Sequence, residues 1–306
     1  MSALKRIASR LDTVGLKHRH NQVRRGWAAS SCSDIAFYDS PKVQYRYRER
    51  GAGQTIVFCA DPPVTLEMYD DLIDLYSQQF RVIVFELPAM GFSLARAGYT
   101  FGWEETNNDI ATFIREVAGK DSILAFSCVA GLAAVDIAVR HPDLVSHLVL
   151  LQTTTVDGFD RWKAARDPKG LLATPIVGQM VMKFLIKKRA PDWFRLAVGK
   201  RQRLGDFCQC SENSIKKGAF WSLASAYQTY LDPGIVLGKP SQPMLALWGL
   251  ADRSHPDENA ERSTTIGSNV EHNAFENLGH FSELEDVQVV YEEIARFWQE
   301  NRSTVT

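Results

Sequence analysis

Short, uninterrupted apolar runs recur along the chain and are typical of strands that are buried on both faces of a parallel sheet. Five such runs are TIVFCA (55–60), RVIVFEL (81–87), SILAFS (122–127), SHLVLL (146–151) and PMLALWG (243–249). Another segment, VQYRYRERG (43–51), alternates in polarity instead, which predicts an antiparallel strand at the edge of the sheet.

Helical patterns separate the strand runs at residues 66–79, 104–118 and 131–140, and a last helix is predicted over 287–300. Repeated strand–helix–strand units imply right-handed crossovers. The expected fold is therefore α/β, a doubly wound and mostly parallel central sheet flanked by helices.

One long segment, from about residue 158 to 233, contains only helix-like sequence between two strand runs. We expect it to form a helical cap over the carboxyl edge of the strands, where ligands bind in open α/β sheets. The predicted organisation is a core of residues 31–157 and 234–306, a cap of residues 158–233, and an N-terminal arm of residues 1–30.

The N-terminal arm is basic, with seven Lys or Arg and one acid, Asp12, among its first 25 residues, although the whole chain has a net charge of −1. The overall balance gives no indication of a nucleic-acid partner. The arm and the Lys- and Arg-rich cap segment 183–203 have two interpretations. They are solvated helix surfaces, or a positive face for an acidic acyl-carrier domain or the phosphates of CoA.

Targeting and redox signals favour a cytoplasmic protein. No apolar stretch is long enough to cross a bilayer, and the N-terminus lacks the pattern of a secretory signal. Five cysteines without framework spacing favour a reducing compartment. Cys208 and Cys210 lack the second ligand pair of a structural zinc site, so no metal is expected there.

The segment SILAFSCVAGLAAVDIAVRHP (122–142) predicts a strand, a sharp turn and a helix. A nucleophile on such a turn projects from the sheet, and the helix N-terminus stabilises negative charge beside it. Ser127 and Cys128 compete for this position, and neither is flanked by the two glycines of the pattern G-x-S-x-G.

This segment resembles the nucleophile elbow and following helix of the α/β-hydrolase family. The register that makes Cys128 the nucleophile fits without a gap, because Gly131, Ala134, Ala138 and Pro142 then fall where the family places such residues. Ser127 would require an insertion of one residue, so Cys128 is the preferred candidate.

Two further motifs extend the resemblance over residues 43–298. LWGLADRSHP (247–256) is similar to the segment that delivers the family's triad acid, which would be Asp252. Gly279-His280-Phe281, ahead of the last helix, is similar to the family's histidine loop, and the order nucleophile, acid, histidine is the one that the family uses.

The resemblance implies a triad of Cys128, Asp252 and His280, in which His280 takes the thiol proton and Asp252 fixes the histidine tautomer. It also implies that the backbone N–H groups of Asp61 and Val129 form an oxyanion hole. It implies no metal and no other cofactor.

The chain departs from the family most clearly after the run 55–60, where Cys59-Ala60 replaces the usual His-Gly and Asp61 follows. A carboxylate at this point opposes a developing oxyanion unless it faces elsewhere or has chemistry of its own. His255 has no expected role here beyond that of a loop residue.

The leading functional hypothesis is an enzyme that cleaves or transfers an acyl group from a thioester or activated ester of a small molecule. Two alternatives stay open at this point. One is a biosynthetic lyase or cyclase that reuses His280 and Asp252, and the other is a non-catalytic ligand-binding protein on the same scaffold.

Overall fold

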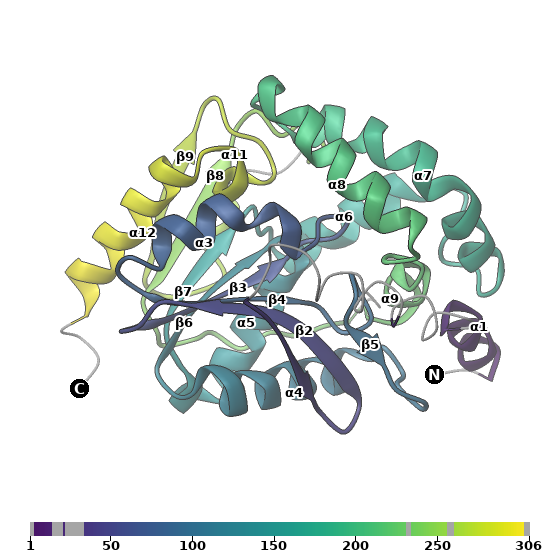
Figure 1. Ribbon diagram of the computed structural model, residues 1–306, viewed down its shortest axis with the longest axis horizontal. Helices are drawn as coiled ribbons and strands as arrows, with labels where there is room; N and C mark the ends of the chain where they lie inside the picture. Colours follow the sequence, from purple (N-terminus) through teal and green to yellow (C-terminus); the bar gives the residue numbers. More distant parts are fainter. Residues whose placement is uncertain (1–2, 14–20, 22–33, 231–233, 256–259, 303–306) are drawn as a thin grey trace.

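The computed structural model describes residues 3–13, 21, 34–230, 234–255 and 260–302. Within these residues, nine strands form one sheet in the order β1-β2-β4-β3-β6-β7-β8-β9, and β5 pairs with β2 (Figure 1). The strands are β1 (Ile35–Asp39), β2 (Val43–Arg50), β3 (Thr55–Ala60), β4 (Arg81–Glu86), β5 (Leu94–Ala95), β6 (Ser122–Ser127), β7 (Val145–Leu151), β8 (Met244–Gly249) and β9 (Val270–Phe275).

Strands β3, β4, β6, β7, β8 and β9 pair in parallel, whereas β2 is antiparallel to its neighbours β1, β4 and β5. The central strands β3, β6, β7 and β8 are buried along their whole length, which is why they appear as continuous apolar runs in the sequence. The predicted α/β fold with a mostly parallel sheet is confirmed.

Helices cover both faces of this sheet (Figure 1). One apolar cluster packs the sheet against α3 (Asp70–Tyr76) and α12 (Val287–Asn301), and the other packs it against α4 (Trp103–Phe113) and α5 (Cys128–Arg140). The remaining short elements are η1 (Leu66–Met68), η2 (Ile114–Ala118), η3 (Pro142–Leu144), α10 (Ala260–Ser263) and α11 (Ser282–Glu285).

The prediction that residues 43–51 form an edge strand is wrong, because β2 pairs with β1 on one side and with β4 on the other. Its polar positions are occupied by buried arginines that form ion pairs. Arg46 is bonded to Glu86 at 3.0 Å, and Arg48 to Asp34 at 3.0 Å. Paired charges are compatible with a buried strand, so alternation in polarity did not mean exposure here.

The described residues between β7 and β8 form mainly helices, which lie beside the carboxyl ends of the strands (Figure 1). The helices are α6 (Val156–Arg166), α7 (Val177–Ala197), η4 (Arg201–Arg203), α8 (Leu204–Lys216) and α9 (Leu223–Thr229). We refer to this interval between β7 and β8 as the cap. Along the described residues, no helix combines the length and apolarity needed to cross a bilayer.

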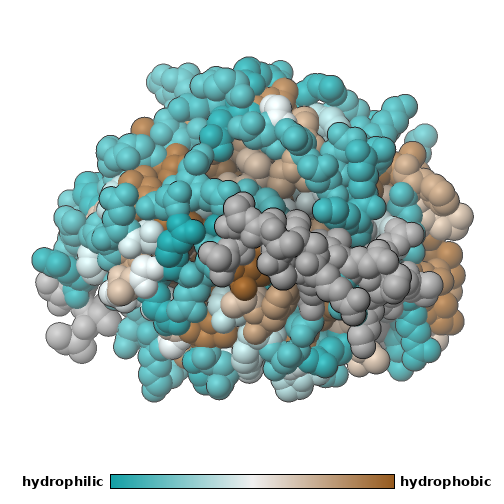
Figure 2. Space-filling model, in the orientation of Figure 1, coloured by the Kyte–Doolittle hydropathy of each residue, from teal (hydrophilic) through white to brown (hydrophobic). Residues whose placement is uncertain are grey.

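The described part of the N-terminal arm, α1 (Ala3–Thr13), packs against the cap. The buried carboxylate of Asp12 accepts a hydrogen bond from Ser225 on α9, and Lys183 on α7 donates to the carbonyl of Leu11 at 2.7 Å. Leu4 and Ile7 of this helix are exposed. Figure 2 shows apolar side chains at the right edge of the face that it draws. Residues 1–2, 14–20 and 22–30 of the arm lie outside the described residues.

The packing of α5 against the end of β7 leaves no room for a side chain at Gly131, so replacing this glycine should destabilise the fold. A Cβ at this position would lie 2.0 Å from Oγ1 of Thr153, which is held at the end of β7. We expect Gly131→Ala to lower the free energy of unfolding by about 1–3 kcal/mol, because the buried helix cannot move away without cost. Urea unfolding measures this loss.

The matched control is Gly205→Ala on α8, where a new Cβ would meet nothing within 4 Å. Here alanine should raise the free energy of unfolding by about 0.5–1 kcal/mol, because it restricts the unfolded chain and suits a helix. Equal effects at the two positions would contradict the packing argument.

Candidate functional site

The turn between β6 and α5 is a strained elbow with Cys128 at its apex. Cys128 has a φ of 55°, a value that residues other than glycine rarely adopt. Because β6 ends at Ser127 and α5 begins at Cys128, the thiol lies at the carboxyl edge of the sheet, where it is partly exposed. Such strain persists only where the surrounding structure imposes it, as at functional turns.

The neighbouring Ser127 points in a different direction. Its side chain is buried, and its hydroxyl donates to Oε1 of Glu283 at 3.1 Å. Burial raises the pKa of Glu283 to about 7, although the hydrogen bond from Ser127 acts in the opposite direction. Ser127 is therefore engaged with a buried carboxyl group, whereas Sγ of Cys128 lies within 4.8 Å of a ring nitrogen of His280.

His280 is completely buried, and its loop is fastened to the end of the cap helix α7. The His280 N–H donates to the carbonyl of Ala197 at 2.7 Å. The Glu285 carboxylate accepts from the N–H of Gly279 at 3.1 Å and from that of Gly199 at 2.8 Å. These bonds fix the imidazole against the sheet before any ligand binds.

The carboxylate of Asp252 is the common acceptor for the groups around it. Its Oδ2 lies 2.9 Å from Nδ1 of His280, 2.9 Å from Nδ1 of His255 and 3.1 Å from Nε2 of Gln152. Its Oδ1 accepts from the N–H of Ser254 at 2.7 Å. Burial favours the protonated acid, but His280 and His255 outweigh burial and hold the pKa of Asp252 well below its usual range.

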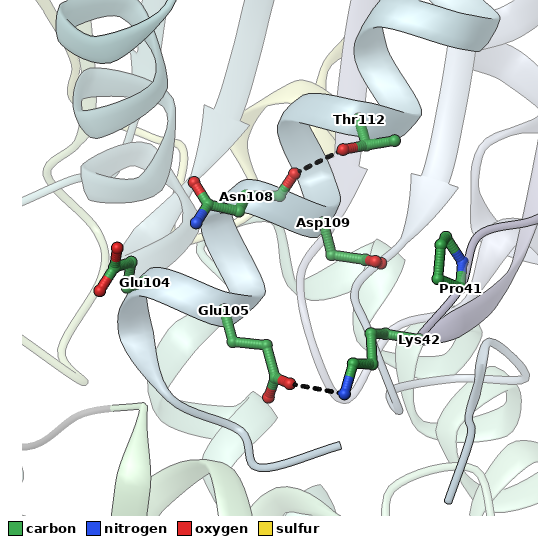
Figure 3. Close-up of a pocket in the computed structure, with 7 residues that line it drawn as sticks. All are labelled: Pro41, Lys42, Glu104, Glu105, Asn108, Asp109 and Thr112. Atoms are coloured by element: carbon green, nitrogen blue, oxygen red, sulfur yellow. Dashed lines mark hydrogen bonds and ion pairs between the residues drawn. The ribbon is translucent and has the colours of Figure 1, made fainter. Parts of the chain in front are cut away.

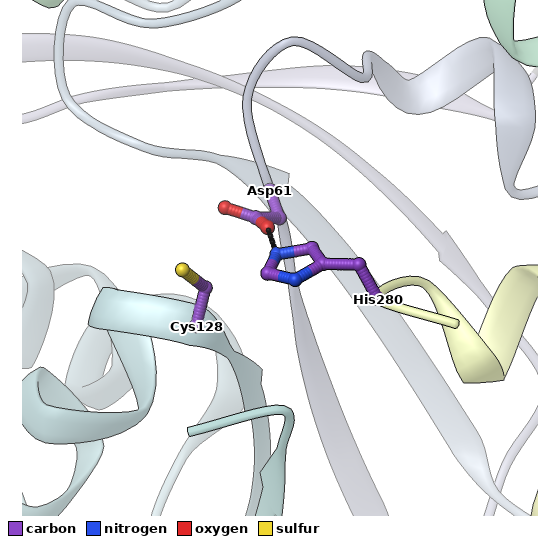
Figure 4. A group of neighbouring side chains, drawn as sticks. All are labelled: Asp61, Cys128 and His280. Carbon is purple, nitrogen blue, oxygen red and sulfur yellow. Dashed lines mark hydrogen bonds and ion pairs between the residues drawn. The ribbon is translucent and has the colours of Figure 1, made fainter. Parts of the chain in front are cut away.

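Asp61, which follows β3, turns its carboxylate into the site. Figure 4 shows its carboxylate bonded to the His280 ring, with the side chain of Cys128 beside them, and the distance from Oδ2 of Asp61 to Nε2 of His280 is 2.9 Å. Carboxyl groups beside both ring nitrogens favour the imidazolium form of His280. Burial alone would lower the pKa of His280, but Asp252 and Asp61 raise it well above 6.5.

His255 is the residue that the sequence analysis missed. It was expected to be a loop residue without a role, but its Nδ1 shares the carboxylate of Asp252 and its ring stacks on that of His280. The two ring centroids are 4.9 Å apart and the planes differ by 10°. In the sequence, the feature that could have pointed to His255 is its position three residues after Asp252, on the loop that follows a buried strand.

The thiol of Cys128 lies among these charged groups. Its Sγ, a carboxylate oxygen of Asp61 and a ring nitrogen of His280 all lie within 4.8 Å of one another. Burial and Asp61 raise the pKa of the Cys128 thiol, but hydrogen bonds with His255 and His280 outweigh them, so that the pKa is lowered overall. A larger fraction of Cys128 is thiolate at neutral pH than of a free cysteine.

The two amides expected to form the oxyanion hole belong to residues at the ends of neighbouring strands. Asp61 follows β3, Val129 follows the residue at the start of α5, and β3 pairs with β6. The N–H of Val129 lies in the first helical turn, where amides have no partner within the helix. Their joint role stays a prediction.

Cap residues cover both histidines. The ring of Trp193 on α7 meets His280 edge-on at 5.3 Å, and the ring of Trp162 on α6 stacks on His255 at 5.5 Å with an angle of 8°. Arg166 on α6 donates to the carbonyl of Ser254 at 2.7 Å. The cap therefore excludes water from the imidazoles and holds the loop that carries His255.

The same side chains contain the N, O and S donor atoms that metal ions bind. The donor atoms of Asp61, Cys128 and His280 lie within 4.8 Å of one another, as do those of Asp252, His255 and His280, so each group could hold a metal ion. Nε2 of His280 and Oδ2 of Asp61 are 2.9 Å apart, at hydrogen-bond distance.

A separate cavity of about 460 Å³ lies between α4 and the turn that joins β1 to β2 (Figure 3). Its polar side chains are engaged within the fold, since Lys42 pairs with Glu105 at 3.4 Å and Asp109 accepts from Ser40 at 2.8 Å. None of the site residues described above lines it. This cavity is not part of the candidate site.

The sequence of the chain is similar to a known protein family and to a hydrolase from yeast. A family model described as alpha/beta hydrolase fold matches residues 63–287. An uncharacterized hydrolase from Saccharomyces cerevisiae is 21% identical over 287 residues, which cover 87% of this chain and 97% of that protein.

Solved structures share the fold at low sequence identity. An epoxide hydrolase from Bacillus megaterium has a TM-score of 0.68 at 16% identity, covering 86% of this chain and 100% of the other. Est816, an N-acyl homoserine lactone degrading enzyme, has a TM-score of 0.65 at 18% identity, with coverage of 86% and 100%. A thermophilic esterase from Thermogutta terrifontis has a TM-score of 0.64 at 17% identity, with coverage of 87% and 97%.

Proposed function

The chain belongs to the alpha/beta hydrolase fold family, and from this premise we propose that it cleaves or transfers an acyl group carried as a thioester or activated ester. In this proposal Cys128 is the nucleophile, His280 exchanges protons, and Asp252 orients the imidazole. Water or another acceptor resolves the acyl-enzyme.

The observation that carries the proposal is the environment of the Cys128 thiol. It stands on a strained strand-to-helix turn, within 4.8 Å of a ring nitrogen of His280. Hydrogen bonds to two imidazoles lower its pKa despite burial and the charge of Asp61. A thiol is the stronger nucleophile when it is ionised near neutral pH, and this environment favours that form.

The reaction has two stages. The thiolate attacks the acyl carbonyl, the amide of Val129 stabilises the oxyanion, and collapse breaks the bond to the leaving group. An acceptor then attacks the acyl-enzyme and releases Cys128. One oxyanion-hole donor lowers the barrier by roughly 3 kcal/mol, so the position of this amide is a main determinant of rate.

The acyl substrate is a small molecule, and its bond type is suggested by two relatives. Est816 degrades an N-acyl homoserine lactone, and the Thermogutta protein is an esterase. Presentation of the acyl group on CoA or on an acyl-carrier domain would suit the Lys- and Arg-rich cap segment 183–203.

Intact-protein mass spectrometry tests the proposal. The protein is incubated with a panel of acyl thioesters and p-nitrophenyl esters, and wild type is compared with Cys128→Ala and Ser127→Ala. We expect an acyl mass increment in wild type and in Ser127→Ala, because the Ser127 hydroxyl is bonded to Glu283, and none in Cys128→Ala.

Two results would contradict the proposal. An increment that disappears only in Ser127→Ala would move the nucleophile by one residue. The absence of an increment on every protein, together with ordinary alkylation of Cys128, would favour the lyase or ligand-binding alternatives.

A further inference from the structure

We propose that the outer surface formed by α1 and α7 docks on an anionic lipid bilayer. We call this surface the apolar face, and it consists of exposed apolar side chains from the two helices: Leu4, Ile7, Leu11, Val177, Met180 and Phe184. The proposal goes beyond the proposed function and does not depend on it, because docking on a bilayer needs no reaction at the candidate site.

The apolar residues of α1 form a row along one side of the helix. Leu4, Ile7 and Leu11 are three and four positions apart, a spacing that places side chains above one another on a helix. All three are exposed, and Ile7 retains 52% of its accessible surface. Ala8 and Asp12 are buried instead. The helix therefore packs against the cap with one side and presents a second, apolar side to solvent.

The cap helix α7 carries a row with the same spacing, formed by Val177, Met180 and Phe184. Phe184 is 75% exposed, and among the large apolar side chains of the described residues Val236 alone is more exposed. The buried side of α7, with Ile186 and Ala190, packs into the core cluster. Exposed apolar side chains that gather in one place mark a contact surface, because their burial is favourable.

The two rows are neighbours on the surface, because α1 packs against α7. Nζ of Lys183 on α7 donates to the carbonyl of Leu11 at 2.7 Å, which ties the ends of the two rows together. Figure 2 shows apolar side chains at its right edge, on the side where Figure 1, in the same orientation, places α1. Each row is about 10 Å long. Rows of this kind insert about 5–10 Å into the boundary between headgroups and acyl chains.

Cations border the apolar face. The three residues that begin three positions after Phe184 are basic and exposed: Lys187, Lys188 and Arg189. Helix α1 carries three further basic residues: Lys5, Arg6 and Arg10. The only acid of α1, Asp12, is buried, and the only acid of α7, Asp192, pairs with Arg195 at 2.5 Å. The surroundings of the apolar rows are therefore positive, as anionic lipid headgroups require.

The charge around the apolar face distinguishes between partners. A second copy of the chain, docked through the same face, would bring its cations against those of the first, and like charges across an interface oppose association. An acidic carrier domain would neutralise the cations, but its charge would not bury the apolar rows. An anionic bilayer supplies both kinds of contact, with headgroups for the cations and acyl chains for the rows.

Co-sedimentation of the full chain with lipid vesicles tests the proposal. Vesicles of phosphatidylcholine with about 30% phosphatidylserine present a negative surface that attracts Lys and Arg, and vesicles of phosphatidylcholine alone are the neutral reference. We expect binding to the anionic vesicles to be at least tenfold tighter than to the neutral ones. Added salt should weaken the binding, because salt screens its ionic part.

Two variants separate the apolar part of the contact from the ionic part. Ile7→Ser/Phe184→Ser removes one apolar side chain from each row and should weaken binding to the anionic vesicles at least tenfold. Lys187→Gln/Lys188→Gln should also weaken it about tenfold or more, because each cation near such a surface contributes about fivefold.

Matched controls carry the same chemical changes outside the apolar face. Val236→Ser removes an apolar side chain that is 90% exposed and lies on the segment leading to β8. Lys120→Gln/Lys239→Gln removes two exposed cations that belong to neither helix. Both controls should bind the anionic vesicles within threefold of wild type. Thermal unfolding verifies that each variant is folded.

Three results would overturn the proposal. The first is a wild type that does not bind the anionic vesicles. The second is binding that needs Lys187 and Lys188 but is unchanged in Ile7→Ser/Phe184→Ser, because a purely ionic contact would fit an acidic carrier domain instead. The third is a wild-type dimer in lipid-free sedimentation velocity that Ile7→Ser/Phe184→Ser converts to a monomer, because the apolar face would then join two copies of the chain.

Discussion

Replacing Asp252 with asparagine should lower kcat/KM for an acyl substrate by about 10⁴-fold, an effect typical of losing the carboxylate that orients a catalytic imidazole. Here the substitution disturbs two imidazole rings, because one oxygen of Asp252 is hydrogen-bonded to both His280 and His255 at 2.9 Å. An asparagine amide at this position can present only one acceptor oxygen, and its NH₂ group would face ring N–H groups. Steady-state kinetics on the substrate found by mass spectrometry measures the loss.

Stability provides a second readout of the same change. The folded pKa of Asp252 is depressed, so its contribution is present above the unfolded value of about 3.9 and is lost as the pH falls. The pKa values of His280 and His255 are raised, so their contribution is present below about 6.5 and is lost as the pH rises through the folded values. The difference in unfolding free energy between wild type and Asp252→Asn should therefore be largest between about pH 4 and 6.5.

The matched control is Asp286→Asn, the same chemical change at the residue that caps α12. Asparagine is also a good N-cap residue, so activity should change little, and stability should fall only by the loss of the ion pair with Lys200, about 1 kcal/mol or less. Asp252→Asn with more than a tenth of wild-type activity would show that the carboxylate does not orient the reacting groups.

Replacing Asp61 with asparagine should move both limbs of the pH profile of kcat/KM to lower pH, each by about 1–2 pH units. Asp61 raises the pKa of Cys128 by its negative charge, and it raises the pKa of His280 by accepting the Nε2 hydrogen bond. The acidic limb reports formation of the thiolate, and the alkaline limb reports loss of the His280 proton. Removal of the negative charge lowers both pKa values.

Because both pKa values fall, Asp61→Asn should change the activity in opposite directions at low and at high pH. At low pH, Asp61→Asn should be more active than wild type, because more Cys128 is ionised. At high pH it should be less active, by about tenfold if the alkaline limb moves by one pH unit, because His280 loses its proton earlier. Asp74→Asn, which changes an exposed acid paired with Arg50, should leave the profile unchanged. An alkaline limb that does not move would show that Asp61 does not control the protonation of His280.

The sequence determined the central sheet because burial on both faces leaves a direct trace in composition. The runs that became β3, β4, β6, β7 and β8 are continuous and apolar, because both faces of these strands pack against apolar clusters. The strands β1 and β9 were not predicted. Their side chains are only partly buried, so they carry polar residues and lack that trace.

The candidate residues Cys128, Asp252 and His280 could be selected from sequence because each lies within a local motif, at the end of a strand or before a helix. The structure brings these three side chains together at the carboxyl edge of the sheet. Their catalytic roles are the subject of the proposal, which local motifs alone cannot establish.

Only the tertiary structure decided where Asp61 and His255 belong. The carboxylate of Asp61 meets a ring nitrogen that is 219 positions away in the chain, and no local pattern specifies such a contact. His255 is near Asp252 in sequence, but its stacking on His280 and under Trp162 depends on the cap and on the histidine loop. Hydrophobic burial was determined by sequence pattern, whereas the charge balance of the site was determined by distances between segments that only the folded chain brings together.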